Sequence, residues 1–501
     1  MELLVIGIDG GTKEIIDNMP MPFTQSLFQQ AKSRTLSEDL ISRGWAEILT
    51  GCHAAENKGF YLMPFADQSY DFSGSYSKND MVNASSSKPL WKILNENNVS
   101  VGIVNVPTTG PVDEVNGFFV AGGGGGLKAK GGLPDNMFFP DECREVLTNT
   151  NYVFDIRLPG KAETISEFIQ NISEAEGGQK DAFVELAALK KPEFGFHCFR
   201  ITTEIQYLCR FEINRCIEGL REASAAGVPF EPKSTVQQSV IEHYQKLDKY
   251  IEDIFTKVKP KDFLFVGDHS TSLFTHEGNL DVWLRDKGYL KVASKETIFI
   301  KKLENFAKKK LASLVSSNAT VNEPKKGLIR KPITQFNTDK TKAFGTFYDT
   351  GNFAGIFIND VQRFGGPVKT EEEVDSLVDQ ICNAFNSEQQ NKDYELCAQP
   401  YKRNFRGAKF AYLMPDIKIH KPDTIYFSSR RWEYIVPNPY LKPIDEPILD
   451  KKYPYTGAKG SDPLFVYSSS LDDCIEDSDP NDLRLAYKMI DRFFSKGKAS
   501  L

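Results

Sequence analysis

Residues 3–9 read Leu-Leu-Val-Ile-Gly-Ile-Asp, and this stretch decides how the rest of the chain is interpreted. A short apolar run of this kind is typical of a strand buried on both faces, as in a parallel sheet. The run ends at a carboxylate, Asp9. A second apolar run, Phe263–Val266, is followed after one glycine by Asp268 and His269. Since open α/β sheets bind ligands beyond the carboxyl ends of their strands, we expect these three side chains to lie in one cleft.

Carboxylate and imidazole groups are ligands for divalent metal ions, and zinc accepts both. The pair Asp268-His269 therefore predicts part of a metal site, which Asp9 would extend from the first strand. The chain contains six histidines in all, widely spread along the sequence. A zinc site built mainly on imidazole is therefore not indicated.

Strand and helix patterns alternate in the first hundred residues. Phe23–Lys32, Trp45–Thr50 and Leu90–Asn97 have helical patterns, and Val101–Val106 is a buried strand. Gly51 directly follows the second of these helices and is a typical helix terminator. This alternation predicts an α/β fold with a mainly parallel sheet sandwiched by helices.

The domain organisation follows from length and pattern. A chain of 501 residues allows two to four domains, or one large α/β domain with insertions. We predict a single domain over residues 1–501. Within it we expect a mostly helical insertion or cap region at residues 150–256, and a lysine-rich insertion of helix and loop at residues 295–340.

The composition is that of an ordinary soluble globular protein, with 40% hydrophobic and 26% charged residues. A net charge of −7 argues against a general nucleic-acid or anionic-membrane surface. The sequence shows no transmembrane run, and the N-terminus lacks the pattern of a signal peptide. We therefore expect a cytoplasmic protein without nucleic-acid or membrane partners. The sequence leaves the oligomeric state open.

Several blocks resemble the alkaline phosphatase superfamily, and in particular its type I phosphodiesterase/nucleotide pyrophosphatase branch. They occur in the order expected for that branch, and together they cover most of the chain. Each is weak alone, but their order makes the resemblance specific. The blocks are Val5–Gly10, Trp45–Gly51, Leu90–Leu94, Val101–Pro111, Gly267–His269 and Leu280–Leu290.

The resemblance implies an alkaline phosphatase-like fold and cleavage of phosphate esters with two nearby divalent metals. Asp9, Asp268 and His269 would hold the metal on the side of the nucleophile. The family's threonine or serine nucleophile precedes the tryptophan of the Trp45–Gly51 block by four residues, and that position is Ile41 here. The next residue, Ser42, is a candidate nucleophile only if the turn shifts by one residue. Otherwise it is a serine near the start of a helix.

The second metal site of the family differs at every ligand. The segment that would supply an aspartate and a histidine carries Thr203 and Tyr207 in their places, with Glu204 one position away. The remaining histidine corresponds to Lys459. A lysine at a metal position can replace part of the metal's charge, as basic side chains do in single-metal relatives. The resemblance therefore implies one divalent metal, zinc, with the second site lost and Lys459 as a catalytic residue.

Other polar residues are also candidates for the site. Asn105 and Thr108 lie at the end of a predicted strand and are expected to bind substrate, or else to cap a turn. His276 and Glu277 could add a ligand pair, but a surface loop is the simpler interpretation. His197 lies in an apolar strand-like stretch and is expected to be a core histidine.

Two functional hypotheses remain from the sequence. The first is a metal-dependent hydrolase of phosphoesters, or of related phosphonates or sulfates, that acts on a small phosphorylated or sulfated substrate with one metal. The alternative is a catalytically degenerate member, a pseudoenzyme, that binds a phosphorylated ligand or a protein partner without turnover. The intact half-site favours the first hypothesis, whereas the replacement of the nucleophile by Ile41 favours the second. The sequence names no particular substrate.

Overall fold

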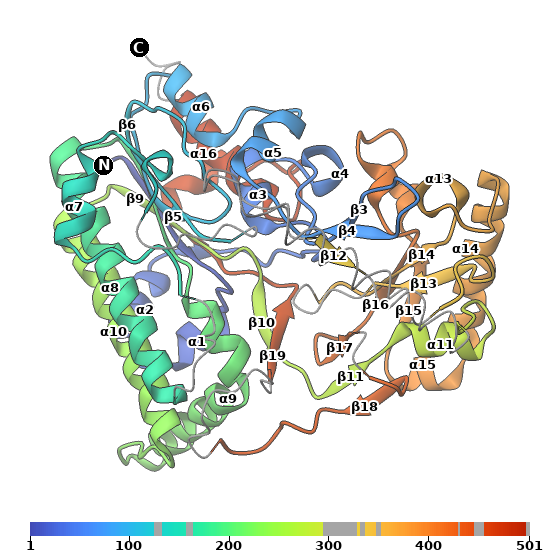
Figure 1. Ribbon diagram of the computed structural model, residues 1–501. Coiled ribbons are helices and arrows are strands. Elements are labelled where there is room, and N and C mark those ends of the chain that lie inside the picture. Colours follow the sequence, from blue (N-terminus) through green and yellow to red (C-terminus); the bar gives the residue numbers. More distant parts are fainter. Residues whose placement is uncertain are drawn as a thin grey trace, which may run out of the picture. The chain divides into compact units, whose positions relative to one another are not determined.

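The computed structural model describes residues 1–124, 133–156, 164–293, 328–330, 336–346, 352–428, 431–444 and 455–496. The chain divides into two compact units (Figure 1). Unit 1 comprises Met1–Gly59, Tyr76–Thr275 and Asn438–Leu501, and unit 2 comprises Phe60–Ser75 and His276–Pro437. That residues 1–501 act as one domain stays a prediction. Of the predicted insertion at 295–340, only residues 328–330 and 336–340 lie within the described chain.

Unit 1 is built on an eight-stranded sheet with the order β2-β20-β9-β1-β8-β5-β6-β7. The five central strands, from β9 to β6, run parallel, and β20, β2 and β7 are added antiparallel at the two edges. The expected α/β fold with a mainly parallel sheet is therefore confirmed. The strands are β1 (Leu3–Ile8), β2 (Lys32–Ser33), β5 (Val101–Val106), β6 (Gly117–Ala121), β7 (Phe138–Phe139), β8 (Phe194–Phe199), β9 (Asp262–Val266) and β20 (Phe465–Tyr467).

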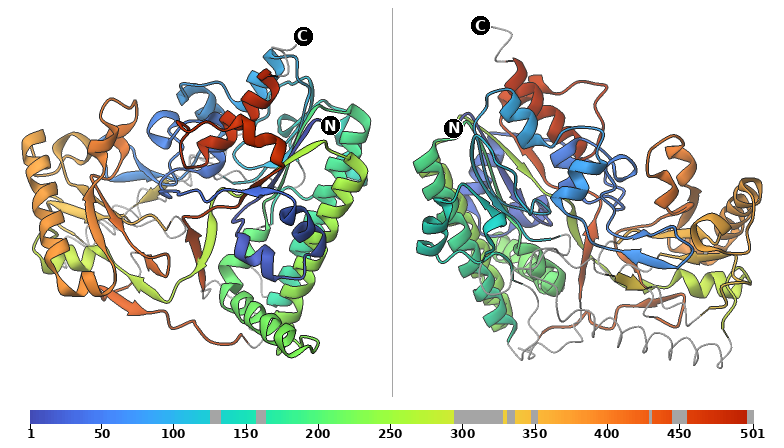
Figure 2. Two further views of the ribbon diagram at one scale, coloured as in Figure 1. Left: turned by 180° about the vertical axis from the view of Figure 1, so that it is seen from behind. Right: turned by 45° about the horizontal axis from the view of Figure 1, so that its top comes forward.

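Helices cover both faces of this sheet, which is why its central strands are mostly apolar (Figures 1 and 2). Alternate residues of β1 belong to different cores: Leu4 and Ile6 to one, Leu3 and Val5 to the other. On the first face lie α1 (Lys13–Asn18), α2 (Pro22–Gln29), α7 (Cys143–Asn149), α8 (Ile165–Lys190), α9 (Thr202–Ala226) and α10 (Thr235–Val258). On the second lie α3 (Gly44–Thr50), α5 (Lys78–Ala84), α6 (Leu90–Glu96) and α16 (Arg484–Lys496).

The segment 150–256 is mostly helical, as expected, but it is not separate from the sheet. It contains β8, which pairs with β1 on one side and β5 on the other. Its long helices pack on the first face of the sheet, where Phe183 and Ile251 are fully buried. The segment therefore supplies a central strand and one of the two helical layers. The strand-like stretch that the sequence shows around His197 is this strand, β8.

Unit 2 contains three small sheets within the described residues. Its core is rich in aromatic side chains, including Phe344, Phe357 and Phe364, and α14 packs against it. The strands are β3 (Met63–Pro64), β4 (Asp71–Ser73), β11 (His276–Gly278), β12 (Leu328–Arg330), β13 (Ala343–Gly345), β14 (Gly355–Ile358), β15 (Cys397–Pro400), β16 (Ile417–His420), β17 (Ile425–Phe427) and β18 (Ile435–Pro437). The helices are α11 (Leu280–Asp286), α13 (Val361–Phe364), α14 (Glu371–Ser387) and α15 (Gln389–Asp393).

Candidate metal centre

Strand register in unit 1 brings together the three residues expected to bind metal. β1 and β9 are parallel neighbours, and Gly7 pairs with Val266. Asp9 and Asp268 each lie two residues beyond that pair, so both follow adjacent strand ends at the same edge of the sheet. The backbone N–H of Gly10 donates to Asp268 Oδ1 at 3.2 Å, which ties the two strand ends together. One ligand atom from each of Asp9, Asp268 and His269 lies within 4.8 Å of the others.

His269 presents its Nε2 atom to the two carboxylates. Its Nδ1 lies 2.6 Å from the carbonyl oxygen of Ser270, and because a carbonyl only accepts, Nδ1 carries the proton. Nε2 is then the unprotonated nitrogen, 3.7 Å from Asp9 Oδ1 and 3.5 Å from Asp268 Oδ1. Burial, with the charge of Lys459, lowers the pKa of His269 to about 3. His269 is therefore neutral at physiological pH, which is the form that binds a metal ion.

Asp9 is held as a carboxylate by its surroundings. Burial alone would raise its pKa, but His269, followed by Arg200 and Lys459, lowers it below the ordinary value. Trp45 contributes to the same effect, because its indole Nε1–H donates to Asp9 Oδ2 at 2.9 Å. The sequence pattern assigns Trp45 no role of its own. Its position is the available signal, since it is the second residue of α3 and follows the loop that contains Ile41.

Positive charge surrounds the two carboxylates. Lys459, from β19 (Gly457–Gly460), places Nζ 3.8 Å from Asp268 Oδ2, and the residue is only 5% exposed. Burial lowers the pKa of Lys459, although Asp268 and Asp9 act in the opposite direction. Arg200 follows β8, is buried, and forms an ion pair of 2.7 Å with Asp155. Asp155 and Asp9 help to raise the pKa of Arg200 against the effect of burial.

This donor set fits a divalent ion. Two carboxylates and one neutral imidazole match the three-ligand pattern of catalytic zinc sites, which leave a further coordination position for substrate. The hydrogen bonds from Trp45 to Asp9 and from His269 to Ser270 orient the ligands, as outer partners do in established metal sites. Asp9, Asp268 and His269 would hold the ion.

The positions expected to have lost the second metal also lie at this centre. The hydroxyl of Tyr207, on α9, is 3.1 Å from His269 Nε2, and the two rings stack at an interplanar angle of 17°. Thr203 lies beside the turn after β1, since a Cβ added to Gly10 would be 2.8 Å from Thr203 Oγ1. Glu204 forms an ion pair with Arg200 at 3.4 Å. Tyr207 and Lys459 therefore contact the metal-site residues directly.

Ile41 and Ser42 lie in the buried loop that precedes α3. This loop packs against the metal-site strand end, because a Cβ added to Gly44 would be only 2.1 Å from the carbonyl oxygen of Asp268. Ser42 Oγ accepts a hydrogen bond from the backbone N–H of Ala54 at 3.0 Å. Ala54 begins α4 (Ala54–Asn57), so the described contact of the Ser42 hydroxyl is with that helix rather than with the three ligands.

Asn105 and Thr108 have structural partners of their own at the end of β5. Asn105 donates through Nδ2 to Gln179 Oε1 and to the carbonyl oxygen of Cys198, each at 2.9 Å. Thr108 donates from Oγ1 to the carbonyl oxygen of Pro107 at 2.6 Å. Both residues have positive φ angles and are buried. These bonds stabilise the chain reversal after β5, so substrate binding by Asn105 and Thr108 stays a prediction.

The other histidine candidates have different surroundings. His197, in β8, is fully buried between Phe183 and Phe199, and burial lowers its pKa to about 3. It is therefore a neutral core residue, as the sequence suggested. His276 and Glu277 lie in unit 2, where Glu277 accepts a hydrogen bond from Ser428 at 2.6 Å. Neither belongs to the metal-ligand cluster found among the described residues.

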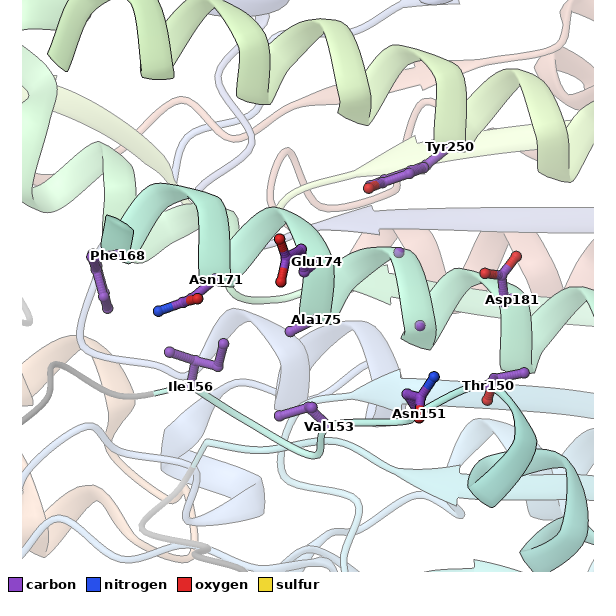
Figure 3. Close-up of a pocket in the computed structure, with 12 residues that line it drawn as sticks. Thr150, Asn151, Val153, Ile156, Phe168, Asn171, Glu174, Ala175, Asp181 and Tyr250 are labelled. Carbon is purple, nitrogen blue, oxygen red and sulfur yellow. The ribbon is translucent and has the colours of Figure 1, made fainter. Parts of the chain in front are cut away.

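A separate pocket of about 690 Å³ lies in unit 1 between α8 and the segment 150–156 (Figure 3). Glu174 and Asp181 of α8 line it, with Val153 and Ile156 on the opposite side and Tyr250 of α10 above (Figure 3). None of the three metal-site residues lines this pocket. Its two carboxylates disfavour an anionic ligand, so it does not suit a phosphate group.

Comparison with known proteins identifies the family of the chain. The family model described as type I phosphodiesterase / nucleotide pyrophosphatase matches residues 3–335. The chain belongs to this family. Its resemblance to the family, expected from the order of the sequence blocks, is thereby confirmed, and the family is one of phosphoester hydrolases. No curated protein matches the chain significantly in sequence.

One solved structure shows the same fold, and a second was also matched. Phosphonoacetate hydrolase from Sinorhizobium meliloti 1021, in complex with phosphonoformate, aligns with a TM-score of 0.55 at 9% identity. The alignment covers 98% of this chain and 95% of the hydrolase. Murine ectonucleotide pyrophosphatase / phosphodiesterase 5 aligns with a TM-score of 0.45 at 12% identity, covering 93% of this chain and 88% of that chain. In the part of the chain that the structure describes, no helix is long and apolar enough to cross a membrane.

Proposed function

We propose that the protein hydrolyses phosphoesters, or related phosphonates or sulfates, with one divalent metal ion held by Asp9, Asp268 and His269. The observation that carries the proposal is the convergence of these three ligand atoms within 4.8 Å at adjacent strand ends. The proton on His269 Nδ1 supports it, because this tautomer leaves Nε2 free to coordinate. Zinc is the expected ion, since it accepts this mixture of oxygen and nitrogen ligands.

Fixed positive charge would replace the second metal of the family. Lys459 and Arg200 both act on Asp9 electrostatically, and both are buried. A phosphoryl group in transfer carries negative charge, and buried cations stabilise it more strongly than solvated ones. A bound divalent ion would supply Lewis acidity and neutralise part of the same charge. Lys459 is therefore proposed as a catalytic residue that contacts the transferred group.

The attacking group is either the Ser42 hydroxyl or a water molecule. Ile41 offers no nucleophilic atom, so we assign that role either to Ser42 or to water. Ser42 Oγ accepts the N–H of Ala54, but its own proton remains available for transfer. Ser42→Ala distinguishes the two routes. Loss of turnover with retained metal binding would assign Ser42, whereas full turnover would assign water.

A second candidate function is binding of a phosphorylated ligand without turnover. Two points favour it: the resemblance to the family places Ile41 at the nucleophile position, and the hydroxyl of the next residue, Ser42, contacts a helix start. The same centre would serve both functions, because a metal ion and buried cations also bind a phosphate group that is not cleaved. Turnover is what separates the two.

The deciding experiment measures metal content and hydrolysis together. Purified wild type and Asp268→Asn are compared for bound zinc and for release of an aryl alcohol from aryl phosphodiester, phosphomonoester, sulfate and phosphonate esters. Asp472→Asn, which changes a half-exposed carboxylate of unit 1, is the matched control. One bound metal with turnover that depends on Asp268 supports the hydrolase. Metal binding without turnover supports the second candidate, and absence of both removes the metal-site proposal.

A further inference from the structure

The hydroxyl of Tyr207 occupies a distinctive place beside His269. It lies 3.1 Å from Nε2, which is the nitrogen that faces Asp9 and Asp268. Since Nδ1 carries the imidazole proton, the hydroxyl donates to the lone pair that a metal ion would use. Tyr207 therefore points its oxygen at the coordination position of His269 and not at solvent.

The distances from His269 Nε2 to its neighbours can be compared with the separations between ligand atoms in a zinc site. In a tetrahedral zinc site with bonds of about 2.0–2.2 Å, neighbouring ligand atoms lie about 3.3–3.6 Å apart. The atoms around His269 Nε2 lie at 3.7 Å for Asp9 Oδ1, 3.5 Å for Asp268 Oδ1 and 3.1 Å for the Tyr207 hydroxyl. The Asp268 distance lies within this range, the Asp9 distance just above it and the Tyr207 distance just below it. The Tyr207 hydroxyl is thus near enough to His269 Nε2 for both atoms to bind one metal ion after a small adjustment.

The position of Tyr207 is well supported by packing. Its ring lies 6.0 Å from that of His269 and nearly parallel to it. Helix α9, which carries Tyr207, packs against both β10 (Ser270–Leu273) and β19, the strands that follow His269 and contain Lys459. Side chains held by packing in this way lose little further freedom when they bind a metal ion.

We infer that the phenol oxygen of Tyr207 is a fourth protein ligand of the metal ion at Asp9, Asp268 and His269. The inference rests on the proposed metal site and deepens it. On binding, the bond between the hydroxyl and Nε2 is replaced by oxygen–metal and nitrogen–metal bonds, and the phenol proton passes to solvent. Tyr207 supplies the hydroxyl-type ligand that Ile41 cannot, and a substrate oxygen would join as a fifth ligand.

A measurement of zinc affinity tests this assignment without relying on turnover. Zinc dissociation constants are measured by competition with a chromophoric chelator for wild type, Tyr207→Phe and Asp268→Asn. Tyr244→Phe is the matched control, because Tyr244 is a buried tyrosine of α10 in the same unit. We expect Tyr207→Phe to weaken zinc binding by at least about 10-fold, the scale on which even outer partners act, with Tyr244→Phe near wild type.

A spectroscopic measurement gives the second readout. Phenolate bound to ferric iron produces a visible charge-transfer band, so iron-loaded wild type should be coloured and Tyr207→Phe colourless. Tyr207→His covers the case in which the phenylalanine variant does not fold, because it should retain zinc binding yet lose the band.

Equal or tighter zinc binding by Tyr207→Phe, or absence of the band in iron-loaded wild type, would overturn the inference and leave the metal site intact. Wild-type zinc affinity in Asp268→Asn would instead remove the proposed metal site, and the role of Tyr207 with it.

Discussion

Lys459→Met is expected to destabilise the metal-free protein and to make zinc more stabilising. Methionine keeps much of the length and apolar volume of lysine but removes the charge. In the wild type, Lys459 Nζ lies 3.8 Å from Asp268 Oδ2 in a buried setting. At that separation, and with an effective dielectric constant of about 20, the attraction is about 4 kcal/mol. Removal of one partner from a buried pair typically costs about 3–5 kcal/mol, because the remaining charge loses its counter-ion.

The expected size of the loss is therefore about 3–5 kcal/mol in the free energy of unfolding, measured by urea denaturation with a chelator present. A divalent cation would restore the missing charge beside Asp9 and Asp268, and it would no longer be repelled by the ammonium group. Added zinc should then raise the stability of Lys459→Met more than that of wild type. In an active enzyme the same change should lower turnover, since Lys459 is proposed to stabilise the transferred group.

Lys180→Met is the matched control. Lys180 is 7% exposed and forms an ion pair with Asp253 at 2.6 Å, but it lies on α8 outside the metal-ligand cluster. It should lose stability without any change in the response to zinc. A loss below about 1 kcal/mol for Lys459→Met in chelator, or an equal zinc effect on wild type and Lys459→Met, would refute the reasoning.

Three further predictions concern residues of unit 1. Trp45→Phe removes the 2.9 Å hydrogen bond to Asp9 and should weaken zinc binding about 10- to 100-fold; Trp91→Phe, which loses an equivalent bond to Asp113, should leave zinc binding unchanged. Gly44→Ala should weaken zinc binding although every proposed ligand is kept, because the added Cβ would lie 2.1 Å from the carbonyl oxygen of Asp268. Calorimetric titration with zinc measures the affinity, and an affinity equal to that of wild type would contradict the prediction. When the pH falls from 7.5 to 5, the free energy of unfolding of His197→Leu should rise by about 2 kcal/mol relative to that of wild type. The reason is that the pKa of folded His197 is about 3, so between pH 6.5 and that value only the unfolded wild-type chain binds the proton. A difference in free energy of unfolding that does not change with pH would disprove this account.

Local sequence was sufficient for the framework of the site. The apolar runs that end at Asp9 and Asp268 are strands whose carboxyl ends meet, because parallel pairing of fully buried strands leaves few alternatives. The resemblance to the family also places Tyr207 and Lys459 at the positions of second-site ligands, and that exchange stays a prediction. The structure brings both of these residues to His269 and Asp268.

Local sequence was insufficient wherever a side chain had several partners to choose from. Asn105 and Ser42 are polar residues at suitable positions, and the sequence offered both for substrate chemistry. In the structure Asn105 bonds to Gln179 and Cys198, and Ser42 to Ala54. Those partners come from other elements of the fold, so periodicity along one segment carries no information about them.

By itself, then, the sequence determined the strand ends that carry Asp9, Asp268 and His269, and the family to which the chain belongs. Only the tertiary structure decided that β8 lies between β1 and β5, and that Trp45 and Tyr207 direct their polar atoms at Asp9 and His269. The physical reason is the distance along the sequence over which each interaction is decided. Strand formation follows from apolar pattern over six or so residues, whereas the partner of a buried polar atom is set by the packing of helices distant in sequence.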